Sequence, residues 1–204
     1  MALQVKGKGN NLLYMSYSHL FAKDFESSVK SMIRVDYAGE MGAVNIYNAQ
    51  IKHSTKNKEL LEEMLDCEVK HFEYFKKISK ELNVPQTVFL SLWSRLASLM
   101  GYVTAKESSS TAMLCTQAVE TIIEEHYTEQ ITQLQDILKY HNTHDTFILE
   151  NKKKIEELLE KIKIFIQEEV EHKETGEKNS QMQPLQFKIM KAFTQTAVII
   201  SEKI

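Results

Sequence analysis

Apolar residues recur every three or four positions along most of the chain, which is the spacing of helices that bury one face. Polar or proline-containing stretches separate six such segments, so the pattern predicts helices over residues 24–53, 57–82, 87–105, 111–140, 146–174 and 185–204. Ser54 and Thr55 would cap the second helix, and Gly176 would end the fifth. The pattern therefore predicts an all-α protein in which four long amphipathic helices form a bundle.

Composition favours the same fold class and excludes several others. Two prolines and six glycines in 204 residues leave little material for the turns of a β-sandwich or barrel. A net charge of −3 gives no general reason to bind nucleic acid. Cys67 and Cys115 are too few and too isolated for a disulfide framework or a zinc site, which favours a reducing compartment. Residues 24–204 are most simply one domain.

The first 23 residues differ from the rest of the chain. They contain Lys6, Lys8 and Lys23 and no acidic residue. Such a segment is either a mitochondrial transit segment, although these usually carry arginine and this one has none, or a flexible leader of a bacterial protein. The sequence leaves both interpretations open.

Two of the predicted helices, residues 87–105 and 185–204, are more apolar than the others. Arg95 is the only charge in the first, which fits a helix in the membrane interface or a buried core helix. Lysines in the second suit an anionic lipid surface. No uncharged apolar run reaches about 18 residues, so no ordinary transmembrane helix is expected. We expect both helices to associate with a membrane surface.

Small residues surround an acidic side chain in the first predicted helix. Ala38, Gly39, Gly42 and Ala43 flank Glu40, although glycine inside a helix costs about 1 kcal/mol relative to alanine. A belt of this kind allows either a tight helix crossing or the close approach of a ligand. By itself the belt favours a tight helix crossing. The acidic residues further along the chain favour the alternative, the close approach of a ligand.

Two Glu-x-x-His motifs, residues 68–71 and 169–172, fall on the second and the fourth long helices. Residues three apart share a helix face, so each pair can hold one metal ion. A bundle with such a motif on two helices and one glutamate on each of the other two is the di-iron carboxylate arrangement. The candidate ligands are Glu40, Glu68, His71, Glu120, Glu169 and His172. Four carboxylates and two Fe(II) ions would give a nearly neutral buried centre.

Spacing alone leaves some of these assignments open. Glu124 lies one turn after Glu120 on the same face, and Glu168 competes with Glu169. Three further residues could support the ligands or face the substrate, namely Asp36, His126 and Tyr127. Asp36, one turn before Glu40, could orient a ligand imidazole through its free N–H group.

In its sequence motifs the chain resembles the demethoxyubiquinone hydroxylases of ubiquinone biosynthesis, which are ferritin-like di-iron carboxylate proteins. Four blocks carry the resemblance in order: residues 34–43, residues 85–93 with Leu92-Trp93, residues 115–130 with His126-Tyr127, and residues 168–172. The resemblance implies the six ligands above, favours Glu120 over Glu124, and implies that Glu68 and Glu169 bridge the irons. Tyr37 stands where that family usually has histidine.

The resemblance also implies a function. The expected protein is a membrane-associated mono-oxygenase with two iron ions, which hydroxylates the ring of demethoxyubiquinol with O2 as co-substrate and NADH as electron source. The chain itself contains no glycine-rich nucleotide fingerprint. The implied partners are the polyprenyl quinol, a lipid surface and other ubiquinone-biosynthesis proteins including a lipid-binding one, and a homo-oligomer is compatible with this picture.

The expected location is the matrix face of the mitochondrial inner membrane, or the cytoplasmic face of a bacterial inner membrane. Three other functions compete with the hydroxylase: a ferritin-like di-iron oxidase of another substrate, a non-catalytic iron-binding protein, and a helical adaptor of a quinone-synthesis complex. Iron content and quinol turnover would discriminate among them.

Overall fold

Helices account for the regular structure of residues 25–54, 56–140 and 146–203, which are the residues that the computed structural model describes. The helices are α2 (Phe25–His53), α3 (Lys58–Glu81), α4 (Leu90–Glu107), α5 (Ser109–Tyr140), α6 (Thr146–Asn179) and α7 (Pro184–Lys203). The predicted all-α class is confirmed, since none of these residues is in a strand. The leader over residues 1–23, the helix cap expected at Thr55 and the loop expected at 141–145 lie outside the described residues.

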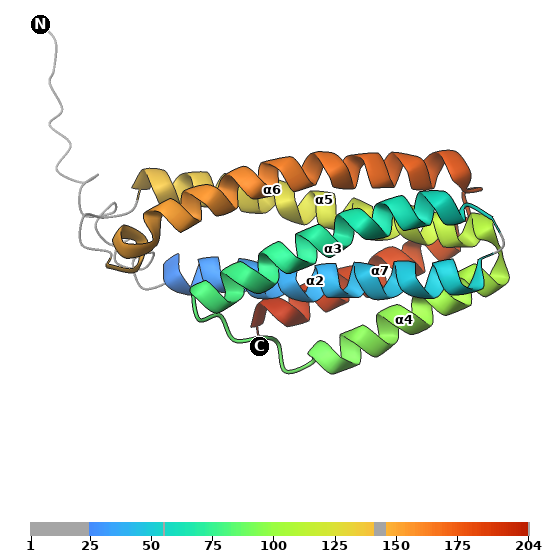
Figure 1. Cartoon of the computed structure of the whole chain (residues 1–204), viewed down its shortest axis with the longest axis horizontal. Coiled ribbons are helices and arrows are strands. Elements are labelled where there is room, and N and C mark those ends of the chain that lie inside the picture. Colours follow the sequence, from blue (N-terminus) through green and yellow to red (C-terminus); the bar gives the residue numbers. More distant parts are fainter. Residues whose placement is uncertain (1–24, 55, 141–145, 204) are drawn as a thin grey trace, which may run out of the picture.

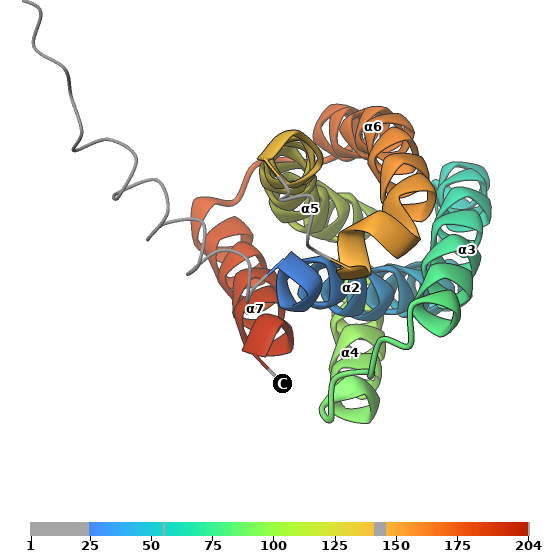
Figure 2. The same cartoon turned by 90° about the vertical axis from the view of Figure 1, so that its left-hand side faces the viewer.

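The four long helices α2, α3, α5 and α6 run side by side (Figure 1). In the end view they surround a common interior, with α4 packed on α2 and α7 lying against both α2 and α5 (Figure 2). Phe75 of α3, Leu134 of α5 and Leu158 of α6 are fully buried in that interior. Each such side chain stabilises the fold by about 1.5–3 kcal/mol. These three side chains belong to the larger apolar cluster of the bundle, and a second buried cluster includes Leu61 and Met113.

The end of α6 differs from the prediction. The helix continues through Gly176 to Asn179, whereas a helix end at residue 174 was expected. A Cβ atom on Gly176 would lie 2.8 Å from both the Gln117 nitrogen and the Met113 oxygen of α5. Glycine therefore lets the two helix backbones approach each other, and this packing outweighs its poor helix propensity.

Predicted helix starts also differ from the structure in α3, in α4 and in α5, which begins at Ser109 instead of residue 111. Helix α3 begins at Lys58 after Asn57, which adopts the left-handed conformation with φ 60° and makes no side-chain cap. The Ser54 hydroxyl does not cap this helix, because it donates to the Lys56 carbonyl at 2.7 Å. Helix α4 begins at Leu90, since Thr87 and the next two residues form a turn closed by the Leu90 N–H.

Helices α4 and α7 expose many apolar side chains. In α4 only Ala97, Gly101, Thr104 and Ala105 are buried, so the alternative of a buried core helix is wrong. Large apolar residues of α4 and α7 remain exposed, among them Leu92, Leu99, Tyr102, Val103, Leu185, Ile189 and Ile199. None of the described helices combines the length and the apolar character needed to cross a bilayer.

Candidate metal centre

The six predicted ligands meet in the middle of the bundle. Helix α2 supplies Glu40, α5 supplies Glu120, and each Glu-x-x-His motif lies on one helix of the remaining pair, α3 and α6. All six side chains are buried, with relative exposures from 0% for Glu169 to 7% for His172. Glutamate is rarely buried to this extent unless it is paired or bound to a metal.

The six side chains form two overlapping groups. One group is Glu40, Glu68, His71 and Glu169, and the other is Glu68, Glu120, Glu169 and His172. Within each group, one ligand atom per residue lies within 4.8 Å of all the others. Glu68 and Glu169 belong to both groups. The arrangement is therefore that of two adjacent cation positions that share two carboxylates.

The side chains of the cluster are arranged in a way that suits cation binding better than hydrogen bonding with one another. The His71 Nδ1 atom lies 3.0 Å from Glu169 Oε1, and the His172 Nδ1 atom lies 2.9 Å from Glu68 Oε1. Within the described residues, several buried atoms here still make no aligned hydrogen bond: Glu68 Oε1, His71 Nδ1, Glu120 Oε2, both Glu169 oxygens and His172 Nδ1. Buried polar atoms without partners are costly. Carboxylate and imidazole donors facing one another in this way fit a pair of divalent iron ions.

The pKa values of the cluster residues also favour a bound cation. Burial and then the Glu68 charge raise the pKa of Glu40 to about 7, although its contacts with His71 lower it. Burial together with Glu169 and Glu68 raises the pKa of Glu120 well above its usual value. Burial alone would lower the pKa of His71, but its close contacts with Cys67 and the cluster carboxylates raise it. Without a cation the centre therefore holds protons that a bound cation would displace.

Two tyrosines brace the glutamates that are not shared. The Tyr47 hydroxyl of α2 donates to Glu120 Oε1 at 2.7 Å, and the Tyr127 hydroxyl of α5 donates to Glu40 Oε1. Each helix thus holds the carboxylate of the other. The sequence reasoning missed Tyr47, although a signal was present: Tyr47 and Tyr127 each follow a candidate ligand by seven residues. Seven residues are about two helical turns, so each tyrosine shares a face with its glutamate.

Asp36 contacts a different set of residues from the one expected. Its Oδ1 atom accepts a hydrogen bond from Gln130 at 2.7 Å and lies 3.5 Å from His126 Nε2. Among the described residues, neither His71 nor His172 pairs with Asp36, contrary to the expectation that it orients a ligand imidazole. His126 belongs to the same polar group, which contains no candidate ligand.

Both competing acids lie outside the two groups that share carboxylates, although Glu168 belongs to a third, less buried group of possible ligands with Cys67 and His71. Glu124 pairs with Lys173 on the partly exposed surface. Glu168 lies behind His71, with its Oε2 atom 2.7 Å from His71 Nε2. The buried cluster therefore contains Glu120 rather than Glu124, and Glu169 rather than Glu168. Tyr37 packs its ring against Phe72, with ring centroids 5.2 Å apart.

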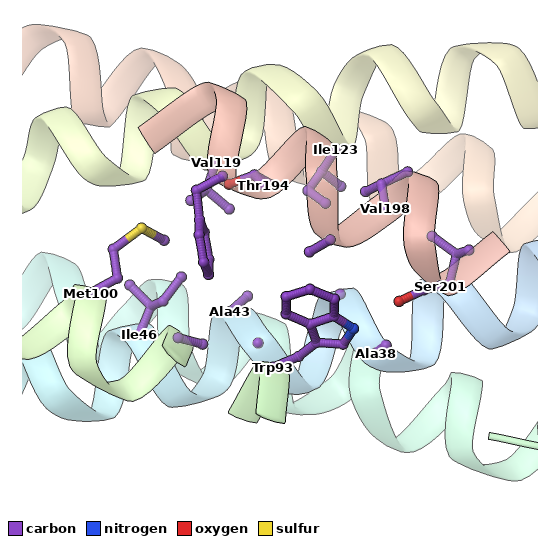
Figure 3. Close-up of a pocket in the computed structure, with 16 residues that line it drawn as sticks. Ala38, Ala43, Ile46, Trp93, Met100, Val119, Ile123, Thr194, Val198 and Ser201 are labelled. Carbon is purple, nitrogen blue, oxygen red and sulfur yellow. The ribbon is translucent and has the colours of Figure 1, made fainter. Parts of the chain in front are cut away.

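An apolar pocket of about 60 Å³ lies on another face of α2. Figure 3 shows Ala38, Ala43 and Ile46 of α2 lining it opposite residues of α5 and α7, with Trp93 and Met100 of α4 at its side. None of the residues that line it carries a titratable side chain. The small-residue belt beside Glu40 therefore forms one wall of a cavity suited to an apolar ligand.

The glycines of this belt are not required by a tight helix crossing. A Cβ atom on Gly42 would meet Ala97 Cβ at 3.9 Å, and one on Gly39 would meet Ile123 Cδ1 at 3.7 Å, which are ordinary contacts. The close crossing of α2 and α4 occurs at Gly101, where a Cβ atom would lie 2.9 Å from Ile46 Cα. Gly39 and Gly42 instead leave the pocket open.

Comparison with known proteins identifies the family. The family model described as "Ubiquinone biosynthesis protein COQ7" matches residues 27–201. The chain belongs to this family. The resemblance found in its sequence motifs is confirmed.

Curated COQ7-family relatives come from eukaryotes and bacteria. The chain is 34% identical to the NADPH-dependent 3-demethoxyubiquinone 3-hydroxylase, mitochondrial, of Dictyostelium discoideum, over 86% of this chain and 77% of that protein. It is 30% identical to the human protein of the same name, over 100% of this chain and 90% of that protein. It is also 30% identical to the 3-demethoxyubiquinol 3-hydroxylase of Rhodospirillum rubrum, over 86% of this chain and 78% of that protein. The names of the Dictyostelium and human proteins specify NADPH, whereas NADH was expected for this chain.

Proposed function

We propose that this COQ7-family protein hydroxylates the ring of a demethoxyubiquinol at a di-iron centre. The reaction consumes O2, two electrons and two protons; one oxygen atom replaces a ring hydrogen as a hydroxyl group and the other leaves as water. The observation that carries the proposal is the buried pair of overlapping ligand groups in a chain whose relatives are named as demethoxyubiquinone or demethoxyubiquinol hydroxylases.

The proposed iron ligands divide between the two positions. Glu40 and His71 would hold one iron, Glu120 and His172 would hold the other, and Glu68 and Glu169 would be available to both. When bound, the iron pair would supply the activation of O2 that hydroxylation requires. Tyr47 and Tyr127 would each keep one oxygen of a terminal glutamate occupied and leave the second oxygen for the cation. High pKa values, raised by burial first, keep both tyrosines protonated as donors.

The apolar pocket beside α2 is the proposed entry for the quinol. Its walls come from four helices, two of which, α4 and α7, also expose apolar side chains. A polyprenyl quinol dissolved in a bilayer could pass between these helices toward the residues next to Glu40. We propose peripheral attachment to the matrix face of the mitochondrial inner membrane, or to the cytoplasmic face in a bacterium, and contact with other ubiquinone-biosynthesis proteins.

Product analysis tests the proposed reaction. Purified protein loaded with Fe(II) is supplied with a short-tailed demethoxyubiquinol, ¹⁸O2 and either NADPH or NADH. The expected product is heavier by one hydroxyl oxygen that carries the heavy isotope, and comparison of the two nucleotides identifies the preferred reductant. Unchanged quinol in a protein that holds two irons would point to an oxidase of another substrate. Protein that binds no iron would favour the adaptor.

Vesicle binding tests the proposed membrane attachment. The double variant Leu92→Ser/Leu99→Ser removes two exposed apolar side chains of α4, with exposures of 45% and 54%. Its co-sedimentation with anionic vesicles should fall about tenfold or more, given about 25 cal/mol per Å² of apolar surface. The matched control Leu149→Ser/Ile164→Ser alters two exposed residues of α6 and should bind as the unmodified protein does. Equal binding by both double variants would exclude α4 as the anchor.

A further inference from the structure

The two imidazoles of the cluster differ on the side that faces away from the carboxylates. In both, Nδ1 points at the cluster, so Nε2 is the outer nitrogen. The outer nitrogen of His71 lies 2.7 Å from Glu168 Oε2. Within the described residues, no carboxylate oxygen lies within 4.0 Å of the outer nitrogen of His172. One imidazole therefore has a carboxylate behind it and the other does not.

The difference arises at equivalent positions of the two motifs. Glu168 directly precedes the Glu169 motif, and Cys67 directly precedes the Glu68 motif. The Cys67 sulfur lies 3.5 Å from His71 Nε2 and also interacts with His172, so this thiol contacts both imidazoles. The residue directly before the motif is therefore the carboxylate Glu168 on α6 and the thiol Cys67 on α3.

The surroundings of His71 suit a fixed hydrogen bond to Glu168. The His71 side chain is 1% exposed and its ring packs on Phe165 with ring centroids 4.0 Å apart. The Glu168 side chain is 39% exposed and can keep its charge at the edge of the bundle. A partly solvated carboxylate therefore faces a ring whose orientation is already restricted.

We infer that Glu168 is a positioning residue that orients His71 and makes the two metal positions unequal. The inference rests on the proposed di-iron function. When Nδ1 of an imidazole binds a cation, its proton resides on Nε2. The Nε2–H group of His71 then donates to Glu168, which fixes the tautomer and strengthens the ring as an electron-pair donor. His172 lacks this support, so the position that His71 shares with Glu40 binds its cation more tightly.

Anaerobic titration with ⁵⁷Fe(II) tests the inference in three forms of the full chain: unmodified, Glu168→Gln and Glu171→Gln. Glu171 is an exposed acid of the same helix, so its variant controls for the lost charge. The Glu168→Gln change should weaken one of the two binding steps by about 10–100-fold and leave the other within about threefold. Mössbauer spectra should show two unequal iron signals in the unmodified and Glu171→Gln proteins, and only one signal should shift in Glu168→Gln.

The outcomes separate this inference from the proposed function. Unmodified protein that binds two irons unequally but does not hydroxylate quinol would remove the proposed function and leave the inference in place. Hydroxylation by all three forms with identical titrations would overturn the inference alone. If the metal-free Glu168→Gln protein melts below the Glu171→Gln protein, Glu168→Asp is measured instead. Restored binding by this variant, which keeps the charge, supports the inference, and failure to restore it overturns it.

Discussion

Helix α2 presents two very different regions of the protein on two of its faces. One face carries Glu40 and Tyr47 into the polar cluster, where nearly every side chain is met by a specific atom from another helix. The other face carries Gly39 and Gly42 to the apolar pocket, where no titratable group is present among the lining residues. The cluster depends on particular functional groups at fixed distances, whereas the pocket depends on side chains being small.

This difference predicts different responses to substitution. Removing a carboxylate from the cluster leaves other buried charged atoms without a partner, which is costly in a low-dielectric interior. Adding atoms to the pocket removes space for a ligand but creates no unpaired polar group. Four predictions, in order of decreasing effect, test this contrast.

The largest effect is expected for Glu169→Ala. Glu169 belongs to both ligand groups and is fully buried, so the variant should lose both irons and lose quinol hydroxylation by more than about 100-fold. Iron content and product yield measure the effect, with the exposed Glu171→Ala as the control. Two retained irons and full activity would exclude Glu169 from the site.

A smaller loss is expected for Gly42→Leu. The new side chain would extend from a position 3.9 Å from Ala97 into the pocket, and quinol turnover should fall about tenfold or more while both irons stay bound. The Gly42→Ala variant, which adds only one methyl group, serves as the control. Unchanged turnover by Gly42→Leu at limiting quinol would show that the substrate uses another route.

The two regions should also differ in their response to pH. The pKa of Glu40 is raised to about 7, mainly by burial, so below that pH a cation must displace its proton. Fe(II) affinity should therefore fall by up to about tenfold per pH unit below pH 7 for each proton displaced. Binding of a quinol analogue to the pocket should change little over the same range. Iron affinity that is constant from pH 8 to about 5.5 would contradict a protonated apo centre.

The smallest effects are expected when alanine replaces a glycine beside the pocket or a glycine at the crossing of α2 and α4. Gly42→Ala meets only an ordinary contact and should raise the free energy of unfolding by about 0.5–1 kcal/mol. Gly101→Ala would press on the backbone of Ile46 and should lower it by about 1–3 kcal/mol. Chemical denaturation of the metal-free proteins measures both, and equal shifts would mean that the two sites are packed alike.

Much of the fold and of the ligand set could be predicted before any tertiary contact was known. Hydrophobic spacing indicated all six described helices within a few residues, because burying one face is a local property of the pattern. The Glu-x-x-His spacing indicated which residues share a face, and the motifs indicated the family. Iron binding by these residues stays a prediction.

The packing of the helices against one another determined which helix faces are in contact. Periodicity along a helix cannot show that Tyr47 reaches across to Glu120, or that Glu168 rather than Asp36 lies behind His71. Likewise, Gly176 signals a helix end by its own propensity, and only close contact with the α5 backbone keeps it inside α6. Local sequence fixes the direction of each side chain from its own helix, whereas the packing of separate helices determines what that side chain contacts.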